Sequence, residues 1–416
     1  MRFIKESFLY TLGTGLGRGL PFLLLPVLTM QLTVEDYGKL SLATTITGLL
    51  AIVIGMNPNL FVFANFFKSD RATFSVKIFN ILFVAMLTCL PVFVIYAFLA
   101  DKLNSYHITF GIFLGMVIVG LNRAVAAMHL AIGQMERRPL SYFVFYLLMA
   151  ISVGAVLAVL IAIDYFTWQS MIFIEAGVLI LLNTLYLGHL AVSGWLTVKL
   201  DTVAIQEFVR FSAPLIGHAA ALWVISFVDR VIIAELAGIA IVGVYSVAQT
   251  IALGLSLLHE SIHRAWQPIF FKKMQSGDDG ERRKIMRYTW AYFGVIIVSA
   301  IMYYLTARFV LGVFLPEEYM GVFVFLPFLI AGYSMLGAYR FVAGYFYHYE
   351  NTRTLSIVTI TCSVLHVVAT VLLVLKFGAI GAAYAAVLTY FVLMITVAIL
   401  VTIKYKIKWT SRSIRV

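Results

Sequence analysis

The sequence predicts an all-α integral membrane protein with twelve transmembrane helices, and three observations lead to this fold class. The 416 residues are 62% hydrophobic and only 12% charged, whereas a soluble globular protein carries roughly 25% charged residues. Apolar stretches of about 20 residues, long enough to cross a hydrocarbon core of about 30 Å as helices, recur along the chain. The stretches are continuously apolar, whereas the strands of a membrane barrel alternate over about ten residues, so helices fit them and barrel strands do not.

Twelve such stretches follow one another with short polar connections. The first begins just after the basic start of the chain, and the last ends before a basic tail. The spans that we predict, in order, are residues 8–31, 41–63, 78–100, 108–130, 141–163, 168–192, 208–232, 239–262, 287–307, 321–346, 355–376 and 379–403.

Lysine and arginine are distributed unevenly over the connections. An even number of spans puts both termini on one side, and the opposite side receives only Lys39, Lys102, Arg308 and Lys376. The positive-inside rule therefore predicts cytoplasmic termini and makes residues 264–287 the longest cytoplasmic loop. The net charge of +11 is then mostly topological, and nucleic acid is not expected as a partner.

Two pieces of the chain repeat at an offset of six spans. The fourth span and its exit read Arg123-Ala-Val-Ala and then Arg138-Pro-Leu-Ser, while the tenth reads Arg340-Phe-Val-Ala and then Arg353-Thr-Leu-Ser. An even offset gives both halves the same orientation, so we predict a parallel repeat. The expected domains are an N-terminal six-helix lobe at 1–192, a cytoplasmic linker at 193–207 and a C-terminal six-helix lobe with a basic tail at 208–416.

Four arginines fall within the predicted spans: Arg18, Arg123, Arg230 and Arg340. Each costs at least about 2.5 to 3.5 kcal/mol in a membrane, so it is expected to face a protein interior or a water-filled cavity. Guanidinium groups bind phosphate and diphosphate through paired hydrogen bonds. We therefore predict an anionic substrate that is bound by Arg18, Arg123 and Arg340.

Further candidates surround these arginines. Tyr333 and Asn57 are candidate contacts for a substrate. Asp229 lies eleven residues after His218, on the same face of the seventh span, so the two side chains could exchange protons; pairing of Asp229 with an arginine such as Arg230 is the alternative. Glu175 is likewise a candidate for cation coupling or for charge pairing. The glycines between Gly13 and Gly19 fit close helix packing better than a nucleotide loop.

Several motifs together resemble one family, although each is loose by itself. The motifs are Leu25-Pro-Val-Leu-Thr-Met-Gln-Leu-Thr-Val-Glu-Asp-Tyr-Gly38, Asp229-Arg-Val-Ile-Ile with Val242-Gly-Val-Tyr-Ser246, Arg264-Ala-Trp-Gln-Pro268 and Phe377-Gly-Ala-Ile-Gly-Ala-Ala-Tyr-Ala. Over essentially the whole chain they resemble the polysaccharide transporter family. Its best-known members are the Wzx-type O-antigen flippases of the multidrug/oligosaccharidyl-lipid/polysaccharide (MOP) exporter superfamily.

The resemblance implies a multi-pass protein of the bacterial inner membrane. It would move an undecaprenyl-pyrophosphate-linked oligosaccharide from the cytoplasmic to the periplasmic leaflet by alternating access. Related exporters couple to H⁺ or Na⁺, and no other cofactor or metal is expected. The implied partners are the lipid-linked substrate, membrane lipids, a polysaccharide polymerase and a chain-length regulator.

Two other functions stay open at this point. A multidrug exporter of the same superfamily would be expected to carry carboxylates, rather than an excess of arginines, in its spans. A membrane enzyme such as a polysaccharide polymerase would be expected to carry a sizeable loop on the outer side, but the longest outer segment, at 307–320, is short and largely apolar.

Overall fold

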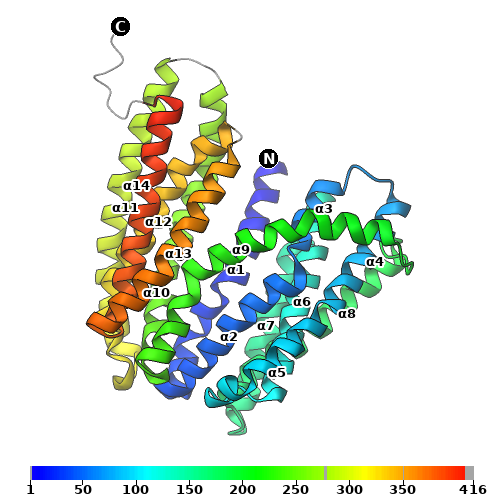
Figure 1. Ribbon diagram of the computed structural model, residues 1–416, viewed down its shortest axis with the longest axis horizontal. Helices are drawn as coiled ribbons and strands as arrows, with labels where there is room; N and C mark the ends of the chain where they lie inside the picture. The colour runs from blue at the N-terminus through cyan, green and yellow to red at the C-terminus, as the bar shows by residue number, and fades with distance from the viewer. Residues whose placement is uncertain (1, 276–278, 350, 408–416) are drawn as a thin grey trace. The chain divides into compact units, whose positions relative to one another are not determined.

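The computed structural model describes residues 2–275, 279–349 and 351–407. These residues form fourteen α-helices and one short 3₁₀ helix, and no strand occurs among them (Figure 1). The helices are α1 Arg2–Gln31, α2 Val34–Gly55, α3 Pro58–Asn65, α4 Arg71–Leu87, α5 Cys89–Ser105, α6 Phe110–Met135, α7 Pro139–Ala162, α8 Trp168–Val192, α9 Thr202–Leu236, α10 Ile239–Gln275, α11 Asp279–Phe314, η1 Glu317–Tyr319, α12 Val322–His348, α13 Thr352–Phe377 and α14 Ile380–Tyr405.

Each predicted span coincides with helix. The second span is divided into α2 and α3 and the third into α4 and α5, while each other span is a single helix. Eleven segments of the described chain are long and apolar enough to cross a membrane. The remaining predicted span lies in α9, which has 35 residues and contains Pro214. The predicted fold class, an all-helical multi-pass membrane protein, is confirmed.

The chain divides into two compact units. Unit 1 comprises Met1–Leu24 and Glu35–Trp223, and unit 2 comprises Leu25–Val34 and Val224–Val416. The division falls inside α9 and not in the linker at 193–207 that the sequence suggested. The first half of α9 belongs to unit 1 because Phe208, 1% exposed, packs into the core of that unit, with its ring 5.3 Å from Phe61.

The short segment Leu25–Val34 groups with unit 2 for a similarly local reason. Leu25 and Leu28 are 3% and 5% exposed. The Tyr319 hydroxyl donates a hydrogen bond of 2.8 Å to the Leu32 carbonyl oxygen. A backbone carbonyl group at the end of α1 is therefore hydrogen-bonded to a side chain of η1.

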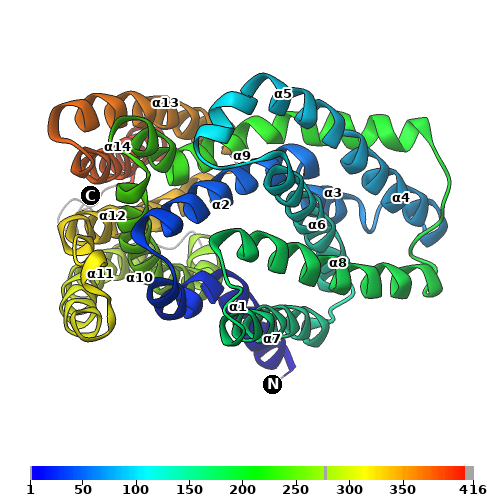
Figure 2. The same cartoon turned by 90° about the horizontal axis from the view of Figure 1, so that it is seen from below.

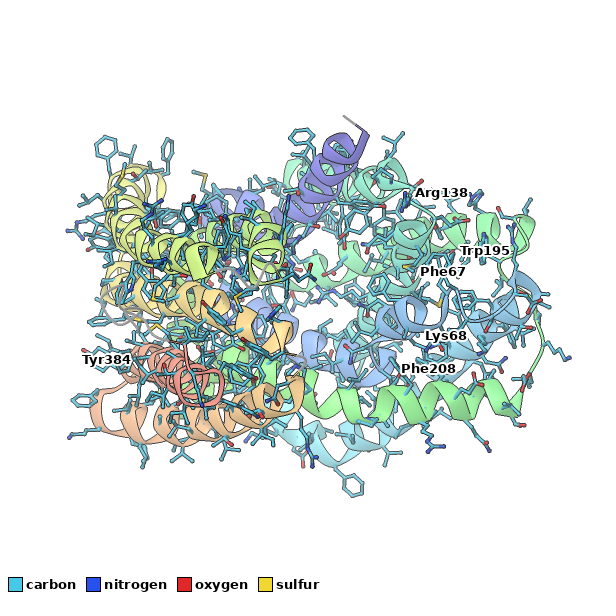
Figure 3. All side chains as sticks on the ribbon, turned by 90° about the horizontal axis from the view of Figure 1, so that it is seen from above. Phe67, Lys68, Arg138, Trp195, Phe208 and Tyr384 are labelled. Atoms are coloured by element: carbon cyan, nitrogen blue, oxygen red, sulfur yellow. The ribbon has the colours of Figure 1, made fainter. Side chains whose placement is uncertain are left out.

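The segment between α8 and α9 is bound along α4. The Thr197 and Ser75 hydroxyls lie 2.7 Å apart, and the Asn80 side-chain amide donates to the Lys199 carbonyl oxygen at 2.9 Å. Trp195 stacks on Phe66 at 5.3 Å and lies beneath the Arg71 guanidinium, 4.5 Å from its ring centroid. Figure 3 labels Trp195 among the side chains of unit 1. Residues 193–201, the first part of the linker expected between the lobes, therefore lie along the surface of unit 1, and we call this segment the strap.

The loop expected at 264–287 is largely helical. α10 continues to Gln275 and α11 starts at Asp279, so α10 alone, with 37 residues, is about 55 Å long, well beyond a hydrocarbon core of about 30 Å. The sequence interpretation was wrong here because falling hydropathy marks where a helix leaves the apolar layer and not where the helix ends.

Ion pairs hold the ends of α10 and α11 together. Glu281 pairs with Lys273 and with Lys284. The hydrogen bond from Lys273, followed by that from Lys284, lowers the pKa of Glu281 to about 2. The carboxylate therefore stays charged at any physiological pH. The ion pair between Lys273 of α10 and Glu281 of α11 is kept over the same pH range.

The two predicted repeat partners, α6 and α12, each run through the middle of their own unit. α6 contacts α3, α7 and α8 in unit 1, and α12 contacts α10, α11 and α14 in unit 2 (Figure 1). Both helices are buried along much of their length. Arg123 and Arg340 are therefore carried by the innermost helix of each unit.

Glycines set how closely the helices of unit 1 approach. A side-chain carbon at Gly17 would lie 2.3 Å from the Tyr146 ring, and one at Gly13 would lie 2.8 Å from the Tyr142 ring. Figure 2 shows α1 beside α7, which carries both tyrosines. A side-chain carbon at Gly15, by contrast, would have no atom of another helix within 4 Å. The close packing expected for this glycine run holds for Gly13 and Gly17.

We predict that Gly17→Ala destabilises unit 1 whereas Gly15→Ala does not. The added methyl group at Gly17 meets the Tyr146 ring, and overpacking of this kind costs about 1–3 kcal/mol. At Gly15 the methyl group meets nothing and removes backbone freedom, so stability is unchanged or gains up to about 1 kcal/mol. Thermal unfolding in detergent measures both; equal melting temperatures for the two variants would contradict the packing.

Candidate functional site

Arg123, on α6, is paired with Glu175, on α8. Its Nε donates to Glu175 Oε1 at 2.7 Å and one terminal nitrogen donates to Oε2 at 2.9 Å. The Arg123 side chain is 37% exposed and the Glu175 side chain 17%. The predicted alternative of charge pairing for Glu175 is therefore observed, and the arginine is neutralised while still accessible.

The break between α2 and α3 lies next to Arg123. Met56 and Asn57 both adopt left-handed backbone angles, with φ of 51° and 55°. Gly55 packs directly on α6, because a side-chain carbon there would lie 2.6 Å from Cβ of Ala124. Left-handed backbone in non-glycine residues costs about 1–3 kcal/mol each and is concentrated at functional sites.

The broken helix leaves polar groups at this point. The Thr88 hydroxyl donates at 2.9 Å to the Ile54 carbonyl oxygen. The side-chain nitrogen of Asn57 is buried and makes no hydrogen bond. Asn57, a predicted substrate contact, thus has an unsatisfied donor. It lies in the helix break that directly follows Gly55, the residue at which α2 packs on α6. Discontinuous membrane helices of this kind form binding sites in many transporters.

A neutral polar network lies farther along the same two helices. The Asn183 amide nitrogen donates to the Asn122 carbonyl oxygen at 2.8 Å, and Asn183 Oδ1 lies 3.0 Å from His129 Nε2. His129 is fully buried and stacks on Tyr186 at 3.8 Å. Its Nδ1 makes no hydrogen bond. The network joins α6 to α8 without any charge.

Arg18 lies on the exposed side of α1. Its charge acts on the Tyr146 hydroxyl of α7, the ring that Gly17 accommodates. The Thr14 and Tyr142 hydroxyls lie 3.2 Å apart one turn earlier. The structure places Arg18 on the α1–α7 pair of unit 1.

Arg340, on α12, is held more loosely than Arg123. One terminal nitrogen lies 3.3 Å from the Ser256 carbonyl oxygen and 3.4 Å from its hydroxyl. The nearest carboxylate oxygen, on Glu260, is 3.8 Å away, and Glu260 binds Arg264 at 2.6 Å. The Arg340 side chain is 23% exposed. This arginine therefore has no tight counter-ion.

A second polar cluster in unit 2 surrounds a buried carboxylate. Asp229, on α9, is 2% exposed and accepts a hydrogen bond from the Tyr245 hydroxyl of α10. Arg230 Nε donates to Gln249 Oε1 at 2.9 Å, and the Gln249 amide donates to the Ser226 carbonyl oxygen. Asp229 is therefore enclosed by uncharged donors on α10 and by its neighbour Arg230.

The charge of the His366 imidazole, on α13, acts on Asp229. His366 is fully buried, with Nδ1 3.0 Å from the Thr389 hydroxyl of α14, and its Nε2 makes no hydrogen bond. His218 lies in the half of α9 that belongs to unit 1. Proton exchange between His218 and Asp229 stays a prediction, and His366 is a second imidazole that the helical spacing did not indicate.

Tyr333 also belongs to this cluster. It is 6% exposed, lies beside Gln249 and interacts with the charge of Asp229. Its ring lies 6.0 Å from that of Tyr390. A side chain this enclosed does not offer a stacking face to a sugar, so the structure groups Tyr333 with Asp229.

The structure therefore brings the predicted residues together in two places. Arg123 pairs with Glu175 in unit 1, with Asn57 at the helix break that packs on α6 at Ala124, and Asp229, Arg230 and Tyr333 lie together in unit 2. Sequence analysis missed His366, Tyr245 and Gln249. A histidine in the eleventh span was a visible signal for His366, and Tyr245 stood in the motif Val242-Gly-Val-Tyr-Ser246 without being singled out as a site residue. Within the described residues, no three metal-binding side chains form a group.

The chain matches the family model described as polysaccharide biosynthesis protein over residues 3–274. It is 22% identical over 388 residues to a protein of the Lsg locus of Haemophilus influenzae, covering 90% of this chain and 92% of that one. A second membrane protein of the same organism is also 22% identical, covering 88% of both chains.

Solved structures share the fold. Lipid II flippase MurJ in an inward closed conformation matches with a TM-score of 0.71 at 13% identity, covering 95% of this chain and 87% of that one. An inward-facing multidrug resistance transporter of the MATE family, in the MOP superfamily, matches with a TM-score of 0.66 at 13% identity, covering 95% and 96%. The fold is that of the MOP transporters, and the resemblance found in the motifs is confirmed.

We expect Tyr245→Phe to destabilise unit 2. The Asp229 carboxylate would lose a donor at a site that water does not reach, and an unsatisfied buried acceptor costs about 1–3 kcal/mol. Tyr384→Phe is the matched control, because Tyr384, on α14, contacts Phe328 and Phe377 through its ring, which the substitution keeps. Melting temperatures in detergent report the difference. A Tyr245→Phe protein as stable as wild type would mean that Asp229 does not depend on this hydroxyl.

Proposed function

We propose that this chain, which belongs to the polysaccharide biosynthesis protein family, is a flippase for lipid-linked oligosaccharides and not an enzyme. The substrate is an oligosaccharide repeat unit of O-antigen or a similar surface polysaccharide, joined through a diphosphate to undecaprenol. It moves from the cytoplasmic to the periplasmic leaflet of a bacterial inner membrane, with both termini of the protein in the cytoplasm.

The observation that carries this proposal is the retention of partly exposed arginines inside membrane-spanning helices. Arg340 is 23% exposed and has no carboxylate oxygen closer than 3.8 Å. A cation that is only loosely paired is expensive in a membrane, and a diphosphate would supply a closer negative charge through hydrogen bonds in a fork geometry. A cationic drug would meet repulsion from the same groups, which favours an anionic lipid over the cargo of a multidrug exporter.

The structural relatives support a transport cycle. One solved neighbour is named a lipid II flippase, and transporters of the MATE family are described in inward-facing and outward-facing conformations. Alternating access would move the charged headgroup while the lipid tail stays in the bilayer. A polysaccharide polymerase and a chain-length regulator would then act on the translocated unit.

A cation gradient would drive the cycle through Asp229. This carboxylate is 2% exposed, interacts with His366, and accepts a hydrogen bond from Tyr245. A buried carboxylate is neutralised most economically by a proton or a bound cation. Binding and release of H⁺ or Na⁺ there would alter the charge that α9, α10 and α13 enclose together.

We expect Arg340→Ala and Arg18→Ala to lower surface polysaccharide in a flippase-deficient strain by about 10- to 100-fold, since a hydrogen bond to a charged group contributes about 1.5–3 kcal/mol. Arg308→Ala is the control because Arg308 lies over the Phe323 ring at 5.1 Å, away from both sites. Surface polysaccharide is measured at equal protein levels, and full complementation by both variants would exclude a cationic substrate site.

Asp229→Asn is expected to uncouple transport from its driving ion. The amide keeps the size of the carboxylate but cannot bind a proton or a cation, so imposed gradients should no longer accelerate flipping. His366→Gln should produce the same loss for a proton gradient and leave a sodium response intact. Flipping of a fluorescent lipid-linked oligosaccharide in proteoliposomes, under separate H⁺ and Na⁺ gradients, measures both. Retained acceleration by either gradient in Asp229→Asn would rule out coupling at this carboxylate.

A further inference from the structure

We propose that Glu175 is a built-in counter-ion that the diphosphate of the substrate displaces from Arg123. The inference rests on the proposed function and assigns Glu175 a role in it: the carboxylate holds the arginine neutral in the empty protein and sets which headgroups can open the pair.

The Arg123–Glu175 ion pair has the same two-hydrogen-bond geometry that a phosphate group would form with Arg123. Arg123 uses Nε and a terminal nitrogen toward the two Glu175 oxygens, at 2.7 and 2.9 Å. The guanidinium fork binds carboxylate and phosphate through the same parallel hydrogen bonds. A phosphate group can therefore replace the carboxylate without rearrangement of the arginine.

Exposure shows that the arginine can be reached. The Arg123 side chain is 37% exposed while that of Glu175 is 17%, so the arginine is the more accessible member of the pair. The helix break at Met56 and Asn57 packs on α6 at Ala124, the residue after Arg123. An incoming anion would thus meet the guanidinium on a helix that also supports this break.

The pair is not needed to hold α6 against α8. Asn183 donates to the Asn122 carbonyl oxygen, the Tyr186 hydroxyl donates to the His129 carbonyl oxygen at 3.2 Å, and His129 stacks on Tyr186. Gly115 also packs closely on Phe173 of α8. These neutral contacts would keep the helices together when the ion pair opens.

Charge balance gives the arrangement its function. An empty flippase must return without its anionic cargo, and an arginine left bare in the membrane would oppose that return. Glu175 supplies the charge in the empty state and the diphosphate supplies it in the loaded state. A neutral lipid cannot compete for Arg123, so Glu175 also excludes the many uncharged lipids around the protein.

Arg340, the repeat-related arginine of unit 2, has no such tightly bound carboxylate. Glu260 stands 3.8 Å from Arg340 and is engaged by Arg264 at 2.6 Å. Arg340 is consequently ready to bind an anion without displacing a carboxylate. Of the two repeat-related arginines, Arg123 is the one whose tight counter-ion would have to be exchanged.

The test measures binding of farnesyl diphosphate, with farnesol as the uncharged comparison, to the purified full chain in detergent. Glu175→Gln should bind farnesyl diphosphate about tenfold more tightly than wild type because the competing carboxylate is gone. Its flipping rate in proteoliposomes should fall, because Arg123 is bare on the return step. Arg123→Met should weaken binding, and Glu136→Gln, which removes the partner of Arg138 at the end of α6, should leave binding unchanged.

A structural ion pair would behave differently. Unchanged or weaker binding by Glu175→Gln, together with a lower melting temperature, would overturn the inference while leaving the flippase proposal intact if Arg123→Met still weakens binding. Absence of farnesyl diphosphate binding to wild type, with full transport by Arg123→Met, would overturn both. Should Glu175→Gln fail to fold, infrared difference spectra decide: adding farnesyl diphosphate to wild type should shift a carboxylate stretch that is altered in Glu175→Asp, and no shift would reject displacement.

Discussion

A positive charge inside a membrane must be given a partner, and much of this structure follows from that constraint. Arg123 is matched by Glu175 through two hydrogen bonds, Arg230 is held by Gln249, and Arg340 is left with Ser256 and a carboxylate 3.8 Å away. The helices that carry Arg123 and Arg340, α6 and α12, are the innermost of their units. The protein thus places its most costly side chains on its best-supported helices.

The two units differ in how their membrane-spanning arginines are paired. Unit 1 has a tight ion pair next to a broken helix, with a neutral network of Asn122, Asn183 and His129 behind it. Unit 2 has a loosely held arginine and, separately, a buried carboxylate that faces His366 and Tyr245. In the proposed flippase, the arginines of both units would bind the anionic cargo and the buried carboxylate of unit 2 would respond to the driving cation.

Backbone irregularities mark the same regions. Left-handed angles at Met56 and Asn57 interrupt the second span where it packs on α6. Gly13 and Gly17 allow α1 to approach Tyr142 and Tyr146, which places Arg18 on the α1–α7 pair. The strap at residues 193–201 fixes the connection between α8 and α9 to α4 through Ser75 and Asn80. Close packing and fixed connections therefore surround the polar groups of unit 1.

Composition and hydropathy by themselves determined the membrane-spanning fold, the positions of the spans and the set of intramembrane charges, because the length and polarity of a helix in lipid depend on local sequence. The parallel repeat was visible because Arg123 and Arg340 stand in matching motifs. Helix lengths beyond the membrane were not visible, since hydropathy does not separate a polar helix such as the end of α10 from a loop. Tertiary structure alone decided which charges meet. Glu175 lies 52 residues from Arg123, and Asp229, on α9, accepts a hydrogen bond from Tyr245 of α10, because such pairings depend on how helices pack against one another and not on spacing along one helix.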